Sequence, residues 1–219
     1  MTGTISQDGL SLIRSYWERL RAGRVAPYRS ELDPRQFDAV LENVFILEQL
    51  NPQQLRVRLA GLRLCELMGL EVRGMPPEAM IEAADRAMFV ELLSDVLKGP
   101  FVGELDLLVN DTAGRALNSE MVLLPMRSDF GEVTRILGCV SIPDGLSYPP
   151  VSFSIAEQRL VPVKVTDTQS KEPELAGFAE EVKPFKRKPS SEPPKLRSVA
   201  GNPDALGPRG DGTHLRVIK

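Results

Sequence analysis

The side chains that could do chemistry are few and widely spaced in this sequence. The only histidine is His214, and the two cysteines, Cys65 and Cys139, do not form a CxxC pair. Nucleophiles of the Ser-His-Asp or Cys-His type need a base within hydrogen-bond reach, which one histidine near the end of the chain does not provide. Zinc needs about four suitably spaced ligands, and two separated cysteines do not supply them. The sequence predicts no catalytic residue and no metal ligand.

The carboxylates form no recognisable acid–base pair. Glu104 and Asp106 stand two residues apart in an apolar run, so they share one face of a strand, and an exposed sheet face explains them better than catalysis does. The sequence has no GxGxxG or Walker motif to hold phosphates. Cys65 and Cys139 are expected to be buried as small apolar residues. We therefore expect a protein that is not an enzyme.

Composition divides the chain near residue 144. Acidic residues outnumber basic ones in 1–144, whereas 145–219 is weakly basic and holds most of the 18 prolines. An acidic folded part argues against nucleic acid as a partner, because binding to the phosphate backbone relies on Lys and Arg. The sequence shows neither a secretory signal nor an apolar run long enough to span a bilayer, so we expect a cytoplasmic protein without membrane insertion.

The N-terminal segment is predicted to be an amphipathic helix over residues 8–22. Its apolar side chains follow a 3-4-3 spacing that lines one face, at Leu10, Ile13, Trp17 and Leu20. This stripe either packs on its own domain or pairs with a second copy of the chain. In the second interpretation, the four residues are the dimerisation site of a homodimer.

The stretch 45–69 is the one around which the rest of the chain is organised. Residues 45–50 and 55–60 are predicted to be antiparallel strands, followed at Gly61 by a corner into a short helix over 62–68 that ends at Gly69. A long helix is expected over 78–98. Three further strands, at 101–110, 115–127 and 133–142, are joined by short turns and should form an antiparallel meander.

Residues 145–219 are expected to be a largely disordered, proline-rich tail, because they are poor in apolar side chains. Two pieces are exceptions. Residues 151–165 show apolar alternation in their second half, and residues 214–219 resemble an isolated strand that could pair with a sheet edge. The expected organisation is an N-terminal helix and loop at 1–30, a folded domain at 31–144 and a tail at 145–219.

A series of local motifs accompanies this order of elements. The motifs are Tyr16-Trp17, Gly23-Arg24-x-Ala26-Pro27-x-Arg29, Asp33-Pro34, Val44-Phe45-Ile46-Leu47-Glu48 and Arg56-x-Arg58-Leu59-Ala60-Gly61-x-x-Leu64-Cys65, with Gly69 and Arg73-Gly74 beyond. Over residues 8–142 the chain resembles a PAS domain, and it is similar to the alphaproteobacterial family of stand-alone PAS-like proteins. The resemblance implies an α+β fold, in which helices cover one face of a five-stranded antiparallel sheet and enclose a ligand-sized pocket.

The resemblance also implies a sensory or regulatory protein that binds signalling partners, with a small ligand in the pocket. The residues expected around this pocket are Gly61, Arg63, Cys65, Phe89, Leu92, Leu93, Val96, Leu105, Leu107, Leu123 and Leu137. Alternatively, these apolar residues only close the core and the tail does the binding, as in a scaffold protein. Arg63 either binds an anionic ligand at the pocket mouth or lies in solvent.

Two cofactors known from PAS domains are disfavoured. The helix that would supply a proximal histidine to haem contains none. Photosensing relatives carry their flavin-reactive cysteine in an Asn-Cys-Arg-Phe context, whereas Cys65 stands in Arg63-Leu64-Cys65-Glu66-Leu67. The identity of any pocket ligand, of the partner and of the stimulus is left open by the sequence.

Overall fold

The computed structural model describes residues 7–110, 116–143 and 151–166. They belong to the first of two compact units of the chain, Met1–Glu172. The second unit, Pro173–Lys219, lies outside the described residues, and so does the terminal strand expected at 214–219.

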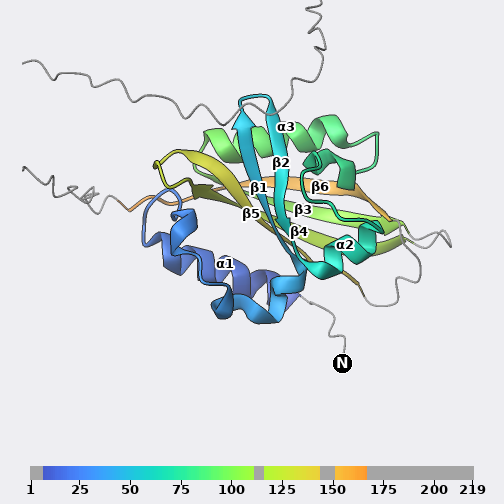
Figure 1. The fold of residues 1–219 in the computed structure, drawn as a ribbon, viewed down its shortest axis with the longest axis horizontal. Helices are drawn as coiled ribbons and strands as arrows, with labels where there is room; N and C mark the ends of the chain where they lie inside the picture. Colours follow the sequence, from blue (N-terminus) through green and yellow to red (C-terminus); the bar gives the residue numbers. More distant parts are fainter. Residues whose placement is uncertain (1–6, 111–115, 144–150, 167–219) are drawn as a thin grey trace, which may run out of the picture. The chain divides into compact units, whose positions relative to one another are not determined.

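One antiparallel sheet, with strand order β2-β1-β5-β4-β3-β6, is the framework of the described part (Figure 1). Its strands are β1 Val44–Asn51, β2 Gln54–Ala60, β3 Phe101–Asn110, β4 Ala116–Arg127, β5 Val133–Val140 and β6 Ser152–Pro162. The α-helices are α1 Gln7–Arg21, α2 Leu62–Met68 and α3 Arg86–Lys98, and the 3-10 helices are η1 Arg29–Glu31, η2 Pro34–Asn43 and η3 Pro77–Met80. The α+β, PAS-like antiparallel fold expected from the sequence is confirmed.

Apolar side chains are buried on both faces of this sheet. Phe45 and Leu47 of β1 pack in a cluster with α2 and α3, whereas Val44 and Ile46 of the same strand pack in a second cluster with α1 and η2. Figure 1 shows α1 and α3 on opposite sides of the sheet, and we call the two sides the α1 face and the α3 face. Because successive side chains of a strand point to opposite faces, a strand covered on both sides must be apolar throughout.

Helix α1 packs on its own domain. Ile13 and Trp17 are 0% and 1% exposed, and Leu10 and Leu20 pack, partly buried, against the same cluster. The indole Nε1 of Trp17 donates a hydrogen bond of 2.8 Å to the carbonyl oxygen of Pro125 on β4. Of the two interpretations of the apolar stripe, the structure therefore supports the first. Ile13 and Trp17 could reach a second copy only if the helix left the sheet.

A sixth strand lies in the segment that the sequence analysis assigned to the tail. Strand β6 pairs with β3 over residues 101–110, and its Phe153 is fully buried in the α3-face cluster. The folded domain therefore extends beyond the expected boundary at residue 144, and the sheet has six strands instead of five; this strand lies in the segment 151–165 that was noted for its apolar alternation. Charged residues such as Glu157 and Arg159 interrupt the apolar ones in β6, which makes its composition resemble that of the tail.

The long helix expected over 78–98 is interrupted before Arg86. Residues 81–85 lie against the free edge of β6, where the N–H of Glu82 donates to the carbonyl of Phe153 at 2.9 Å. The N–H of Ile155 donates to the carboxylate of Asp85 at 2.8 Å. Since the backbone groups of an edge strand need partners, these bonds favour a non-helical segment over a further helical turn.

The same connection between α2 and α3 also covers the opposite edge of the sheet. On β2, the N–H of Val57 donates to the carbonyl of Met75 at 2.9 Å, and its carbonyl accepts from the N–H of Gly74 at 2.7 Å. The outer backbone groups of both edge strands, β2 and β6, are therefore partly hydrogen-bonded by this one segment.

The corner from β2 into α2 requires glycine at position 61. A Cβ on Gly61 would lie 2.2 Å from the backbone oxygen of Glu42. Helix α2 then ends at Gly69, whose φ of 68° is in the left-handed region that glycine adopts readily. The strand–turn–strand–helix order expected for 45–69 is confirmed.

Gly138 on β5 makes room for the ring of Phe45 on β1. The two residues are directly opposite each other in the register, and a Cβ on Gly138 would lie 2.1 Å from the ring. Because Phe45 is fully buried, its ring has no solvent-filled space to move into.

We expect Gly138→Ala to destabilise the domain by about 1–3 kcal/mol, because the added methyl group must displace a buried ring or the strand itself. Urea unfolding followed by the fluorescence of Trp17 would measure the loss. In a Phe45→Leu background the same substitution should cost less, since the smaller side chain leaves space. An equal cost in both backgrounds would contradict the proposed contact.

Cys139 is buried in the α1-face cluster, as expected, and burial raises the pKa of its thiol to about 12. An unperturbed thiol has a pKa of about 9.0. Between these two pKa values the unfolded chain loses the thiol proton while the folded chain keeps it. The contribution of this group to stability is therefore present below about pH 9 and is lost as the pH rises towards 12.

We expect only Cys65, which is half-buried, to react with an aromatic disulfide reagent in the native protein at mildly alkaline pH, and both cysteines to react in denaturant. Cys65→Ser should remove the native reaction and Cys139→Ser should leave it unchanged. Equally fast modification of both native thiols would show that Cys139 is accessible.

Candidate functional site

Most of the apolar residues expected around a pocket share one buried cluster on the α3 face. The members from α3 and from the strands are Phe89, Leu92, Leu93, Val96, Leu105, Leu107 and Leu123. Each is 2% exposed or less. The structure therefore brings these side chains together between α3 and the sheet, where they pack against one another.

Leu137 lies on the other face of the sheet and must be removed from this set. It is buried in the α1-face cluster, opposite Ile46 in the register. Its neighbours on β5 explain why. Gly138 faces Phe45 on the α3 face, so the alternation of side chains directs Leu137 towards α1.

The three residues expected at the entry of α2 are not gathered at a pocket mouth. Gly61 is the residue before α2 and closes against the backbone of Glu42. The guanidinium of Arg63 lies 3.4 Å from the carboxylate of Glu66, one turn further along the same helix. Cys65 packs against the edge of the α3-face cluster, with its Sγ 3.9 Å from a carboxylate oxygen of Glu71.

A groove of about 400 Å³ lies between the β1–β2 hairpin and α3, and we call it the hairpin groove. Leu93 and Leu97 of α3 and Leu55 of β2 line it with apolar side chains. The other lining residues are Gln49, Pro52, Gln53, Gln54, Arg56, Pro76, Pro77, Glu78, Val90 and Ser94. Its volume is typical of small-molecule sites, and Leu93 connects it to the buried cluster.

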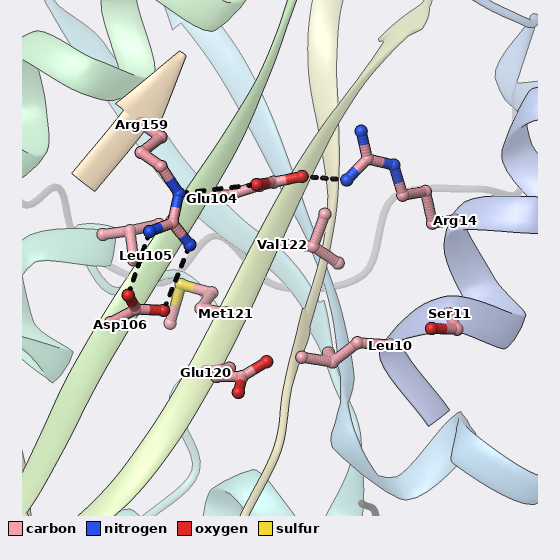
Figure 2. A pocket seen from close by; sticks show the side chains of 10 residues that line it. All are labelled: Leu10, Ser11, Arg14, Glu104, Leu105, Asp106, Glu120, Met121, Val122 and Arg159. Carbon is pink, nitrogen blue, oxygen red and sulfur yellow. Dashed lines mark hydrogen bonds and ion pairs between the residues drawn. The ribbon is translucent and has the colours of Figure 1, made fainter. Parts of the chain in front are cut away.

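On the α1 face, Glu104 links α1 to β6 through two arginines. Figure 2 shows its carboxylate between Arg14 of α1 and Arg159 of β6, with Arg159 at 3.7 Å. Arg159 also donates to both carboxylate oxygens of Asp106, at 3.1 and 3.3 Å, and lies 3.2 Å from Glu157. The pKa of Arg159 is raised, mainly by its hydrogen bonds to Asp106 and secondly by the one to Glu157.

Sequence reasoning placed Glu104 and Asp106 on one face of a strand but did not identify the arginines that pair with them. Arg159 was assigned to the tail, so its position opposite Glu104 in the β3–β6 pair could not be predicted. A hollow of about 210 Å³ adjoins this network beside Leu10 and Glu120. In this arrangement Arg14 and Arg159 neutralise neighbouring carboxylates, so we assign the network a structural role.

Arg21 makes a second link between α1 and the chain that follows β6. Its Nη2 donates to the carbonyl of Lys164 at 3.1 Å, and its Nη1 donates to the carbonyl of Arg24 at 2.6 Å. The guanidinium also pairs with Glu18 and lies over the ring of Trp17, 5.5 Å from the centroid. At 4% exposure, Arg21 is a buried cation that is fully engaged by these partners.

The described residues contain neither a metal-binding cluster nor a membrane-spanning helix. Among 7–110, 116–143 and 151–166, no three His, Cys, Asp or Glu side chains lie close enough together to hold a metal ion. Within the same ranges, no helix combines the length and the apolar character needed to cross a bilayer. His214 lies outside these ranges.

No curated protein matches the sequence. Solved structures that are similar to about half of this chain include the light state of the LOV domain of the blue-light photoreceptor Aureochrome1, with 11% identity, 50% of this chain and 88% of that chain covered, and a TM-score of 0.36. Another is a light-oxygen-voltage domain studied with a flavin analogue, with 16% identity, 50% and 84% covered, and a TM-score of 0.39. A third is the Vibrio cholerae VqmA dimer, with 17% identity, 52% and 55% covered, and a TM-score of 0.35.

The family is shown by a different comparison. A family model described as PAS domain matches residues 6–141, which is more than half of the chain. This range includes β1 to β5 and the helices on both faces, and it ends before β6. The chain belongs to the PAS domain family.

Proposed function

We propose that this protein is a non-catalytic PAS signalling protein that binds protein partners and is modulated by a small ligand in the hairpin groove. The observation that carries the proposal is the position of Leu93, which lines the groove and is also part of the buried cluster between α3 and the sheet. Leu97 also belongs to both the groove and the cluster and is 8% exposed, so a ligand in the groove would contact a core side chain there. PAS domains bind their small ligands between these same layers, which supports the choice of this face.

The links on the α1 face support a route from the groove to the flanking segments. Val96 of α3 packs within contact distance of Gly103 on β3. The next residue, Glu104, faces the other side of the sheet and pairs with Arg14 and Arg159. A displacement of α3 would therefore reach both α1 and β6 across the thickness of one strand.

A second candidate function is that of a scaffold whose tail binds partners. It is favoured by the full burial of Phe89, Leu93 and Val96, which close the α3-face core with the protein's own side chains. In this case the domain anchors the tail and no ligand is needed.

Three narrower proposals accompany the main one. The cytoplasmic location rests on the use of two cysteines without a disulfide pattern. The similarity to stand-alone alphaproteobacterial proteins rests on the motif series. A homodimer through α1 would have to use residues outside the buried stripe, such as Leu12, which is 39% exposed.

We expect native mass spectrometry of the protein purified from its own host to show a mass excess over the denatured chain. Val90→Trp should abolish this excess, because Val90 lines the hairpin groove and is 43% exposed, so the larger side chain can fill the groove without disturbing the core. Leu12→Trp on α1 is the matched control and should retain the ligand. Identical native and denatured masses would favour the scaffold.

We expect partner binding to survive deletion of residues 167–219. The deletion begins after Thr166 in order to keep β6 and the bonds of Val163 and Lys164 to Pro100 and Arg21. Affinity capture from the host by the full chain and by the shortened chain, compared by quantitative mass spectrometry, tests this. If the specific partners are lost while the shortened chain keeps its unfolding midpoint, the tail is the binding element.

A further inference from the structure

We propose that a pocket beside the β1–β2 hairpin binds a small organic phosphate through a group of arginines. The pocket has a volume of about 570 Å³ and lies on the sheet side opposite the α3 cluster, next to Ile46. We call it the arginine pocket, because its lining includes Arg29, Arg58, Arg73 and Arg135. It is separate from the hairpin groove, so the proposal goes beyond the proposed function and does not depend on it.

Two of the four arginines are held in place by one carboxylate. The carboxylate of Glu48 forms ion pairs with both, at 2.8 Å from the Nη2 of Arg135 and 3.6 Å from the Nε of Arg58. One negative charge therefore orients two guanidinium groups without neutralising both of them. Arg135, which is 21% exposed, is the more restrained of the two, and a restrained donor loses little freedom when it binds an anion.

The other two arginines, Arg29 and Arg73, have guanidinium groups without a partner in the part of the chain that the structure describes. The pocket also contains the carboxylates of Glu71 and Asp129, but that of Glu71 already accepts from the backbone N–H of Arg73 at 3.2 Å. With Glu48 included, four guanidinium groups face three carboxylates. Since guanidinium groups stay protonated, the pocket keeps an excess of positive charge at physiological pH.

The remaining donors of Arg135 indicate what kind of anion fits. Its Nε is buried and has no hydrogen-bond partner among the described residues, although the side chain as a whole is 21% exposed. A guanidinium offers five N–H donors in a planar fork, which matches the several acceptor oxygens of a phosphate group. A phosphate in the pocket would accept from the exposed part of this guanidinium and not from the buried Nε.

Apolar surface around the arginines indicates that the phosphate belongs to an organic molecule. Ile46, Leu59 and Ala60 line the pocket, and Leu59 is 43% exposed. Phe130, the residue after Asp129 in the β4–β5 turn, is 95% exposed. A flat ring attached to the phosphate could cover this surface, since aromatic and guanidinium groups both stack on rings. These features together fit a molecule of the nucleotide class.

The test is isothermal titration calorimetry of the full chain with ADP as the probe. We expect ADP to bind about tenfold more tightly than either pyrophosphate or adenosine, because each of these offers only one part of the recognised chemistry. Arg29→Gln and Arg73→Gln should each weaken ADP binding about fivefold. Arg35→Gln is the matched control, because Arg35 is exposed on η2 and does not line the pocket, and it should change the affinity less than twofold.

Two further measurements separate the parts of the proposal. Phe130→Ala should weaken ADP but not pyrophosphate, and rising potassium chloride should weaken both, since the charges are partly exposed. Unfolding midpoints equal to that of the unmodified chain confirm that each variant is folded. The proposal is overturned if Arg35→Gln weakens ADP as much as the pocket variants do, if adenosine binds as tightly as ADP, or if an acidic or phosphorylated peptide binds more tightly than ADP.

Discussion

Burial of the sheet on both faces is the constraint on which the rest of this structure depends. Strand β1 begins with four buried residues, Val44–Leu47, whose side chains alternate between the two clusters. Strand β5 is likewise buried at every residue from Ile136 to Val140. With no wet face on the central strands, α1 and η2 are part of the domain core, and removing them would expose the apolar side of the sheet. Charged side chains are therefore absent from the buried parts of β1 and β5.

This constraint also explains which features the sequence could predict. The order β1, β2, α2 was predictable because Gly61 and Gly69 mark the corner and the helix end, and because charged and apolar residues alternate in β2. Leu137 was assigned to the wrong face because the apolar run around it contains no polar residue to mark a solvent side. A strand buried on both faces carries no alternation in polarity, so its register can be set only by its neighbours.

Strand β6 and the arginine pocket were hidden for a different physical reason. The exposed half of β6 is charged, and its stability comes from pairing with β3, on which Asp106 and Glu104 offer partners to Arg159. The residues of the arginine pocket come from strands, a 3-10 helix and loops that are far apart in the sequence. The position of Arg58 among them depends on a register shift in the β1–β2 pair. In this pair Ile46 is opposite Leu59, whereas Leu47 is opposite Val57. Arg58 lies in this irregularity, and local sequence does not encode where it points.

The same irregularity makes the β1–β2 hairpin the common wall of the two hollows. Leu55 lines the hairpin groove, whereas Arg58 and Leu59, beyond Val57, line the arginine pocket. Strand β2 is at the edge of the sheet, and its outer side is held at Val57 by backbone hydrogen bonds to residues 74 and 75. Residues on either side of these two also line the hollows. Residues 76–78 line the hairpin groove, and Arg73 lines the arginine pocket. Because β2 pairs with only one other strand, it can shift without disturbing the doubly buried centre of the sheet. The two hollows therefore share one strand as a wall, so that any displacement of this edge would alter the lining of both.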